Sequence, residues 1–246
     1  MTYEACVFSV EEAVRAQRAG VHRIELNSSK PEGGCTPSYG NIAWIMKNLD
    51  IRVTPMIRPR GGGFVYTDRE FDVLKEDVRM AVSLGVDSVI TGVLTADSAL
   101  DTKKLEEVIK IADKTPVAFH LAYERIAPEK KDEALEQLIS IGVKRLLYGG
   151  RPKTYEQALE CLKIMMEKAN GRIDIMTCDM DVVPHSKLPE FIRNTGVQEY
   201  HMWDICCKYD LGTYSKTLDH VDWKDMADQE MMAARIALLE KAQNSY

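Results

Sequence analysis

The 246-residue sequence lacks the signals of several protein classes. Its N-terminus has no basic segment followed by an apolar stretch, and no run of about 18 apolar residues occurs anywhere. We therefore expect a cytoplasmic protein that does not associate with membranes. Lys and Arg form no cluster long enough to follow a phosphate backbone, and the formal net charge is -6, so nucleic acid is not an expected partner.

Several catalytic motifs are missing as well. The six cysteines include no C-x-x-C pair, which favours free thiols in a reducing compartment. The first predicted strand is followed by no G-x-G-x-x-G, which argues against an open dinucleotide-binding sheet. It carries no H-x-H for a binuclear metal centre, and no predicted strand ends in a lysine suited to a Schiff base. The segments "TCDMDVVPH" and "HMWDICC" lack the glycines of the usual barrel phosphate site.

What the sequence does contain is a regular alternation of short apolar runs and longer segments with helical spacing. The runs predict strands at 2–8, 22–27, 51–57, 86–93, 115–120, 143–148, 172–177 and 197–202. The intervening segments predict helices at 9–20, 38–49, 68–85, 101–113, 129–142, 154–170 and 186–196, and a last helix at about 224–243. Eight such units predict one TIM-barrel domain over residues 1–246, with an extended C-terminal segment before the last helix.

In a TIM barrel the ligand site lies at the C-terminal ends of the strands, so polar residues there are informative. The "RIELN" strand places Glu25 and Asn27 on one face, and the apolar neighbours of Glu25 indicate that its carboxylate points into the barrel mouth. A buried carboxylate needs a partner, and we expect Arg58 to pair with Glu25 or to bind the same ligand. A purely structural ion pair is an equal alternative. The candidates at strand ends are Glu4, Glu25, Asn27, Arg58, Arg60, His120, Asp179 and His201.

The stretch "PMIRPRGGGFVYTDREF" at 55–71 ends a predicted strand with two arginines and three glycines. Glycines 61–63 favour a close backbone approach to a ligand or a mobile lid, although an ordinary flexible loop is the commoner meaning. Guanidinium groups match carboxylate geometry, so Arg58 and Arg60 suggest an anionic or hydroxyl-rich ligand.

The cysteines suggest a different function. Cys178 follows the seventh predicted strand, and Cys206 and Cys207 follow the eighth, which ends near His201. Soft thiolate ligands select Cu(I), so these three residues are candidate copper ligands. Unpaired cysteines are more often small buried hydrophobic residues, and that alternative stays open.

Five stretches, "YEACVFS", "HRIELNSS", "EGGCTPSYG", "MIRPRGGGFVYTDREF" and "VAFH", resemble the CutC copper homeostasis family closely over residues 1–120. The resemblance implies a cytosolic TIM barrel that self-associates as a dimer or tetramer and is linked to copper handling. It also implies a barrel mouth built from Glu4, Glu25, Arg58, Arg60, His120 and His201. The second half departs from the family pattern at "HLAYE", which contains Glu124, and at "YGGRP", where Arg151 adds a cation. These departures predict a shifted ligand preference.

The sequence therefore supports two main hypotheses for the function. A third is an oligomeric scaffold that acts through its surface. The first is a CutC-like copper homeostasis protein that binds Cu(I) through Cys178, Cys206 and Cys207. The second is an enzyme that acts on a small carbohydrate-like or carboxylated substrate by acid/base chemistry with an arginine clamp. Its catalytic candidates are Glu4, Glu25, His120 and His201, and its ligand-binding candidates are Asn27, Arg58, Arg60, Glu124, Arg151 and Asp179.

Overall fold

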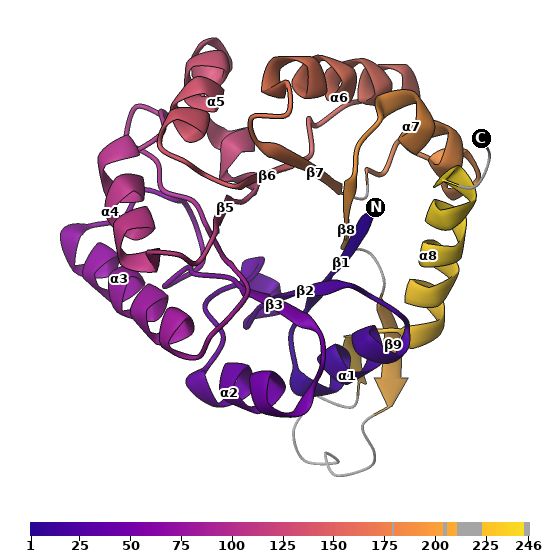
Figure 1. Cartoon of the computed structure of the whole chain (residues 1–246), viewed down its shortest axis with the longest axis horizontal. Helices are drawn as coiled ribbons and strands as arrows, with labels where there is room; N and C mark the ends of the chain where they lie inside the picture. Colours follow the sequence, from indigo (N-terminus) through magenta and orange to yellow (C-terminus); the bar gives the residue numbers. More distant parts are fainter. Residues whose placement is uncertain (179, 204–205, 211–222, 244–246) are drawn as a thin grey trace.

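The computed structural model describes residues 1–178, 180–203, 206–210 and 223–243. Eight short parallel strands form a ring inside a shell of helices (Figure 1). The strands are β1 (Thr2–Val7), β2 (Arg23–Leu26), β3 (Arg52–Pro55), β4 (Val89–Thr91), β5 (Val117–Phe119), β6 (Arg145–Tyr148), β7 (Asp174–Cys178) and β8 (Glu199–Met202).

Strand pairing closes the ring almost completely. Each strand pairs with its sequence neighbour from β1 to β3 and from β4 to β8, and β8 pairs with β1. Between β3 and β4 the contact is a single parallel bridge of Met56 with Ile90, supported by a hydrogen bond from the Ile57 amide to the Ile90 carbonyl at 2.8 Å. The predicted TIM barrel is thus confirmed.

The helices alternate with the strands and cover the outside of the barrel (Figure 1). They are α1 (Val10–Arg18), α2 (Tyr39–Asn48), α3 (Asp68–Ser83), α4 (Thr102–Ala112), α5 (Lys131–Ser140), α6 (Tyr155–Ala169), α7 (Leu188–Thr195) and α8 (Gln229–Gln243), with short 3₁₀ turns η1 (Lys30–Glu32), η2 (Leu121–Arg125), η3 (Pro128–Lys130) and η4 (His185–Lys187). Thr67 and Glu70 form a complete capping box at the start of α3. None of the helices in the described part of the chain is long and apolar enough to cross a membrane.

The C-terminal helix was predicted too long. Residues 223–227 form strand β10 (Trp223–Ala227), which pairs antiparallel with β9 (Cys206–Asp210), and α8 begins only at Gln229. The Asp228 carboxylate accepts a hydrogen bond from the Met231 amide at 2.9 Å, which caps the first turn of α8. Cross-strand pairing with β9 therefore overrides the helical spacing that we inferred from Met226.

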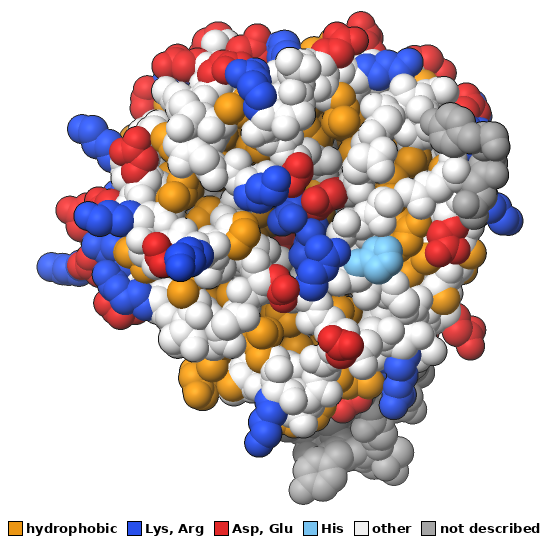
Figure 2. All heavy atoms as spheres, viewed as in Figure 1, with side chains coloured by type: hydrophobic (Ala, Val, Ile, Leu, Met, Phe, Trp, Pro, Cys, Tyr) orange, Lys and Arg blue, Asp and Glu red, His pale blue; other side chains and the backbone are white. Residues whose placement is uncertain are grey.

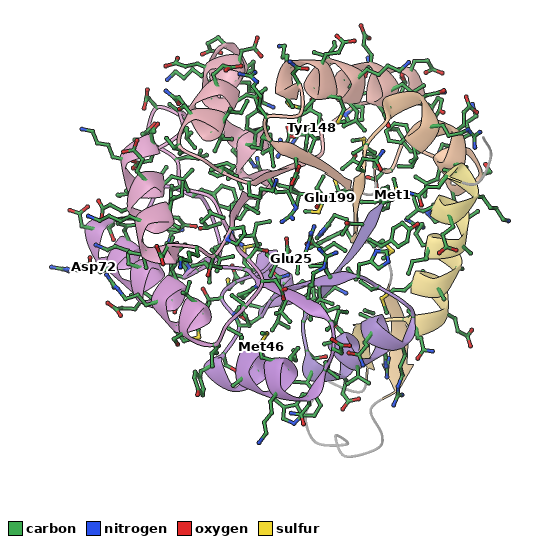
Figure 3. The ribbon with its side chains drawn as sticks, in the orientation of Figure 1. Met1, Glu25, Met46, Asp72, Tyr148 and Glu199 are labelled. Carbon is green, nitrogen blue, oxygen red and sulfur yellow. The ribbon has the colours of Figure 1, made fainter. Side chains whose placement is uncertain are left out.

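Side-chain alternation along the strands separates a charged interior from an apolar shell. In β2, Ile24 and Leu26 pack into the core between strands and helices, whereas Arg23 and Glu25 belong to the interior, where Figure 3 shows Glu25 and Glu199 within the ring of strands. The other half of the interior is apolar and consists of Met56, Ile90, Ala118, Leu147 and Met176. On the face drawn in Figure 2, a group of Lys and Arg with neighbouring Asp and Glu lies near the centre, over the ring of strands.

Candidate functional site

A chain of buried charges crosses the barrel interior below the mouth. Glu4 accepts hydrogen bonds from His201 Nδ1 at 2.8 Å and from Arg23 Nε, and Arg23 also contacts Glu199 at 2.6 Å. Arg145 donates to the same Glu199 oxygen. Burial alone would raise the pKa of Glu4, but the Arg23 guanidinium and His201 outweigh it and lower that pKa to about 2. Glu4 is therefore an ionised carboxylate that orients His201, and His201 lines the cavity above it.

Glu25 has a different environment although it lies on the neighbouring strand. Asn27 Nδ2 donates to Glu25 Oε1 at 2.9 Å, and the Cys6 thiol lies 3.8 Å from the same oxygen. The other oxygen, Oε2, is buried without a hydrogen-bond partner. Burial is the main cause that raises the pKa of Glu25, and the Glu4 carboxylate adds to it. Glu25 is thus poised to exchange a proton.

His120 is held as a neutral imidazole. Its Nδ1 accepts a hydrogen bond from the Ala122 amide at 3.0 Å, so the ring proton is on Nε2, which is buried without a partner. Burial, aided by the charge of Arg58, lowers the pKa of His120 to about 3. The ring packs against Phe64, with centroids 4.8 Å apart, and closely against Gly92, where a Cβ atom would lie 2.3 Å from His120 Cε1. The site therefore presents an N–H donor that does not titrate near neutral pH.

The two arginines of the glycine-rich stretch organise the loop itself. Arg58 donates through Nη1 to the carbonyls of Glu32 at 2.7 Å and Gly34 at 2.6 Å, and through Nη2 to the Gly62 carbonyl at 2.7 Å. Within the described residues no hydrogen bond or ion pair joins Arg58 to Glu25, because both Nη atoms donate to these carbonyls, while Nε is buried without a partner. That Arg58 and Glu25 bind the same ligand stays a prediction. The positive charge of Arg58 still lines the cavity and lies over the Phe64 ring at 5.1 Å.

Arg60 is turned away from the mouth. It pairs with Glu70 at 2.6 Å and donates to the carbonyls of Gly61, Gly63 and Val65 at 2.7–3.0 Å. It is not among the residues that line the cavity. The glycine-rich loop is therefore fastened by Arg58 and Arg60. At Gly61 a Cβ atom would clash with the Glu32 side chain, and Gly62 has a positive φ of 80°, so both positions favour glycine.

A cavity of about 200 Å³ opens at the barrel mouth. Of the predicted site residues, the structure brings together Glu25, Arg58, His120, Cys178 and His201 around it. The remaining wall residues are Gly33, Met56, Phe64, Leu121, Leu147 and Trp203. Phe64 was missed by sequence reasoning, although its position directly after three glycines could have indicated an aromatic side chain placed by the loop.

Other predicted site residues have structural contacts or lie elsewhere. Glu124 is buried, accepts hydrogen bonds from the amides of Gly149 and Gly150 at 3.1 and 2.9 Å, and pairs with Lys131 at 2.9 Å. Arg151 is exposed on the rim, with a positive φ of 48°. Asp179 and the side chains of Cys206 and Cys207 lie outside the described residues, so the predicted cysteine cluster stays a prediction.

Three residues that could hold a metal ion meet at the base of the cavity. The ligand atoms of Cys6, Glu25 and His201 all lie within 4.8 Å of one another, and all three side chains are buried. Cys6 faces Glu25 because the β1–β2 register pairs them directly. The sequence could not indicate this role for Cys6 without the strand register. A thiolate, an imidazole and a carboxylate together suit a borderline metal such as Zn²⁺ or Cu²⁺ better than Cu(I), which prefers sulfur.

Comparisons with known proteins match most of the chain. The model of the CutC family matches residues 1–205, which include every residue that lines the cavity. The chain belongs to the CutC family. Among its CutC relatives, a human copper homeostasis protein cutC homolog is 38% identical over 198 residues, which cover 80% of this chain and 71% of the human protein. A CutC family protein of Bacteroides fragilis is 37% identical over 201 residues, or 81% of this chain and 78% of that protein.

Solved structures extend the comparison to the fold. The crystal structure of CutC from Streptococcus agalactiae superposes with a TM-score of 0.76 at 32% identity, covering 82% of this chain and 98% of that one. A thiamine phosphate pyrophosphorylase from Pyrococcus furiosus superposes with a TM-score of 0.59 at 14% identity over 98% of this chain and 96% of that one, a likeness of fold alone. The match to CutC proteins therefore establishes the family, whereas the chemistry of the site is inferred from this chain's own residues.

Proposed function

We propose that this CutC family member is an enzyme that moves a proton at a carbon next to a carbonyl group of a small polar substrate. The observation that carries the proposal is that an unpartnered carboxylate oxygen and an unpartnered imidazole N–H, on Glu25 and His120, belong to residues that line one cavity. A base and a neutral donor in one partly apolar cavity are the parts that enolisation requires.

Each group has a defined role in this proposal. Glu25 Oε2 removes the proton, and the electron pair moves onto the substrate oxygen to give an enediolate. His120 Nε2–H donates a hydrogen bond to that oxygen without having to lose a proton of its own, because its pKa of about 3 keeps the ring neutral. The positive charge of Arg58 stabilises the same developing negative charge. Return of the proton from Glu25 to the neighbouring carbon, together with transfer of the hydroxyl proton from one enediolate oxygen to the other, completes the isomerisation; return to the original carbon gives exchange only.

The pH dependence of the reaction follows from Glu25. Because burial raises the pKa of Glu25, the acidic limb of the rate profile lies above the ordinary carboxyl value of 4.5. The rate rises with pH through that limb as Glu25 ionises. His201, which is hydrogen-bonded to the Glu4 carboxylate at 2.8 Å and lines the same cavity as Glu25, offers a second proton-transfer group.

Deuterium exchange tests the proposal without knowledge of the natural substrate. The wild-type protein is incubated in D₂O with a panel of three- to six-carbon hydroxyketones and hydroxyaldehydes, and NMR follows exchange at the carbon next to the carbonyl. We expect exchange on at least one compound, reduced by about 10²–10⁴-fold in Glu25→Gln and retained in Glu106→Gln, an exposed control on α4. Equal exchange in wild type and Glu25→Gln would contradict the role of Glu25, and no exchange across the panel would contradict the proposal.

A second candidate function is metal binding, favoured by the cluster of Cys6, Glu25 and His201. The names of the relatives link CutC proteins to copper homeostasis. In this chain the cluster would hold the ion; Cys178 pairs in register with His201 and lines the same cavity, but it is not part of the cluster.

Competition titrations with Cu(I), Cu²⁺ and Zn²⁺ against chromogenic chelators test this candidate in the reduced protein. Tight 1:1 binding that is lost in Cys6→Ser and kept in Cys161→Ser, a cysteine of α6, supports the cluster. Binding that is insensitive to Cys6 but lost in the Cys178→Ser, Cys206→Ser and Cys207→Ser triple variant places copper at the cysteines that the sequence suggested. Absence of binding by the wild type removes the metal candidate.

A further inference from the structure

An open groove continues from the cavity toward the rim of the barrel. It measures about 800 Å³, and it shares Gly33, Arg58, Phe64 and Leu121 with the cavity wall. Its outer wall is formed by the loop after β4, by η2 and by the turn after β6, which contribute Leu94, Thr95, Ala96, Ser98, Arg125 and Arg151. The cavity and the groove therefore adjoin at these four residues.

Two arginines of this groove lack internal partners. Arg125 and Arg151 are both exposed, and among the described residues neither guanidinium makes a hydrogen bond or an ion pair. Most other cations on nearby loops are already engaged: Lys130 pairs with Asp97 at 2.6 Å and Lys131 with Glu124 at 2.9 Å. The two arginines are thus the groove's available cations.

Glu124 holds the two arginine-bearing segments together. It directly precedes Arg125 on η2, and its Oε1 accepts the amides of Gly149 and Gly150, the two residues before Arg151. Arg151 itself adopts a positive φ of 48°, a conformation that is rare for a residue with a side chain and persists where the surroundings impose it. The buried Glu124 carboxylate therefore joins the backbone of η2, which carries Arg125, to the backbone of the turn that carries Arg151.

The charge balance of the groove favours an anion. Arg58, Arg125 and Arg151 line it, against one acidic side chain, Glu32. Asp181 lies with Arg151 in the adjoining hollow without forming an ion pair to it. Guanidinium groups recognise carboxylate and phosphate oxygens through paired N–H donors.

We infer that the substrate carries an anionic group, a phosphate or a carboxylate, that binds between Arg125 and Arg151 while its carbonyl end occupies the cavity. The inference rests on the proposed enzymatic function and adds the substrate class to it. In this arrangement the reacting end occupies the cavity of about 200 Å³ and the anionic group lies in the adjoining groove.

Isothermal titration in the Glu25→Gln background tests this site apart from turnover. The probes are dihydroxyacetone phosphate and hydroxypyruvate, which carry the two kinds of anion on a three-carbon ketone, and uncharged dihydroxyacetone. We expect Arg125→Gln/Arg151→Gln to weaken binding of at least one anionic probe by about ten-fold or more, and to leave dihydroxyacetone unchanged. The probe that responds identifies phosphate or carboxylate as the preferred group.

Two further variants make the test specific. Glu32→Gln removes the one acid of the groove and should tighten the same anionic probe by about two- to five-fold. Arg18→Gln/Arg193→Gln removes two exposed cations from the last turns of α1 and α7, at the opposite end of the barrel, and should leave binding unchanged.

The inference is overturned if neither anionic probe binds more tightly than dihydroxyacetone, or if the groove and control pairs lower affinity equally. Its failure is separable from that of the enzymatic proposal. Arginine-dependent binding without any deuterium exchange by the wild type would keep the anion site and remove the enolisation chemistry. Deuterium exchange that does not depend on Arg125 and Arg151 would keep the enolisation chemistry and remove the anion site.

Discussion

Replacing His120 with asparagine should remove a specific part of the protein's pH-dependent stability. In the folded protein His120 has a pKa of about 3, whereas an unfolded histidine has a pKa of about 6.5. Between these values the unfolded chain binds one proton that the folded chain does not, so His120 makes the protein less stable as the pH falls. The contribution is fully present above about pH 6.5 and is lost progressively toward pH 3.

The size of the effect follows from the fraction of unfolded chains that carry the proton. Between about pH 6 and pH 5 an average of about 0.9 proton is bound by the unfolded histidine, which corresponds to a loss of about 1.2 kcal/mol in the free energy of unfolding. His120→Asn keeps an oxygen that can accept the Ala122 amide hydrogen bond at the start of η2. Its pH dependence should therefore be shallower than that of the wild type by about 1.2 kcal/mol over this interval.

Urea unfolding followed by circular dichroism at several pH values between about 5 and 7 measures this difference. Comparing slopes with pH removes the constant cost of the substitution, and contributions from other groups cancel between the two proteins. A His120→Asn slope equal to that of the wild type would refute the buried neutral imidazole, and with it the proposed donor.

Three further predictions concern the supports of the site. Gly92→Ala should lower the thermal midpoint, because the new Cβ would lie 2.3 Å from His120 Cε1, and we expect a cost of about 1–3 kcal/mol. Thermal melts measure the effect. Gly149→Ala is the control, because its Cβ would meet its nearest atom at 3.4 Å. Glu4→Gln should destabilise the fold by about 3 kcal/mol in urea unfolding, because it leaves a buried guanidinium with one fewer counter-charge, and a cost below about 1 kcal/mol would contradict the role of the network. Arg60→Gln should speed cleavage of the glycine-rich loop by a nonspecific protease, since that side chain holds three loop carbonyls, and unchanged cleavage would show that the loop is held otherwise.

The barrel could be predicted from the sequence because its signals are local. Apolar runs, helix caps and side-chain alternation each depend on neighbouring residues, and alternation within "RIELN" was enough to place Glu25 inside. The C-terminal helix was misjudged because β10 forms by pairing with β9, a contact that a window on residues 224–228 does not contain.

The site could be predicted only in part because its contacts join distant segments. The two arginines at 58 and 60 stand out in the sequence, but it does not show that their donors bind carbonyls of η1 and of the glycine-rich loop, because only the folded loop brings these oxygens near. Cys6 became a site residue through the β1–β2 register, and Phe64 through the course of the loop. The sequence therefore indicated charged residues near strand ends, whereas their contact partners became known only from the three-dimensional structure.

Burial acts on three ionisable groups of the barrel with different results, and the difference lies in their partners. Glu4 has Arg23 and His201 beside it, so its pKa falls to about 2 despite complete burial. Glu25 and His120 line the cavity without a direct counter-ion, so burial raises the pKa of the carboxyl group and lowers that of the imidazole. The interior thus keeps fixed charges at its centre and, at the mouth, places a neutral imidazole donor beside a carboxyl group whose pKa is raised. A substrate that develops negative charge would meet a donor and a base there, both prepared before it binds, and this separation is the physical basis of the proposed catalysis.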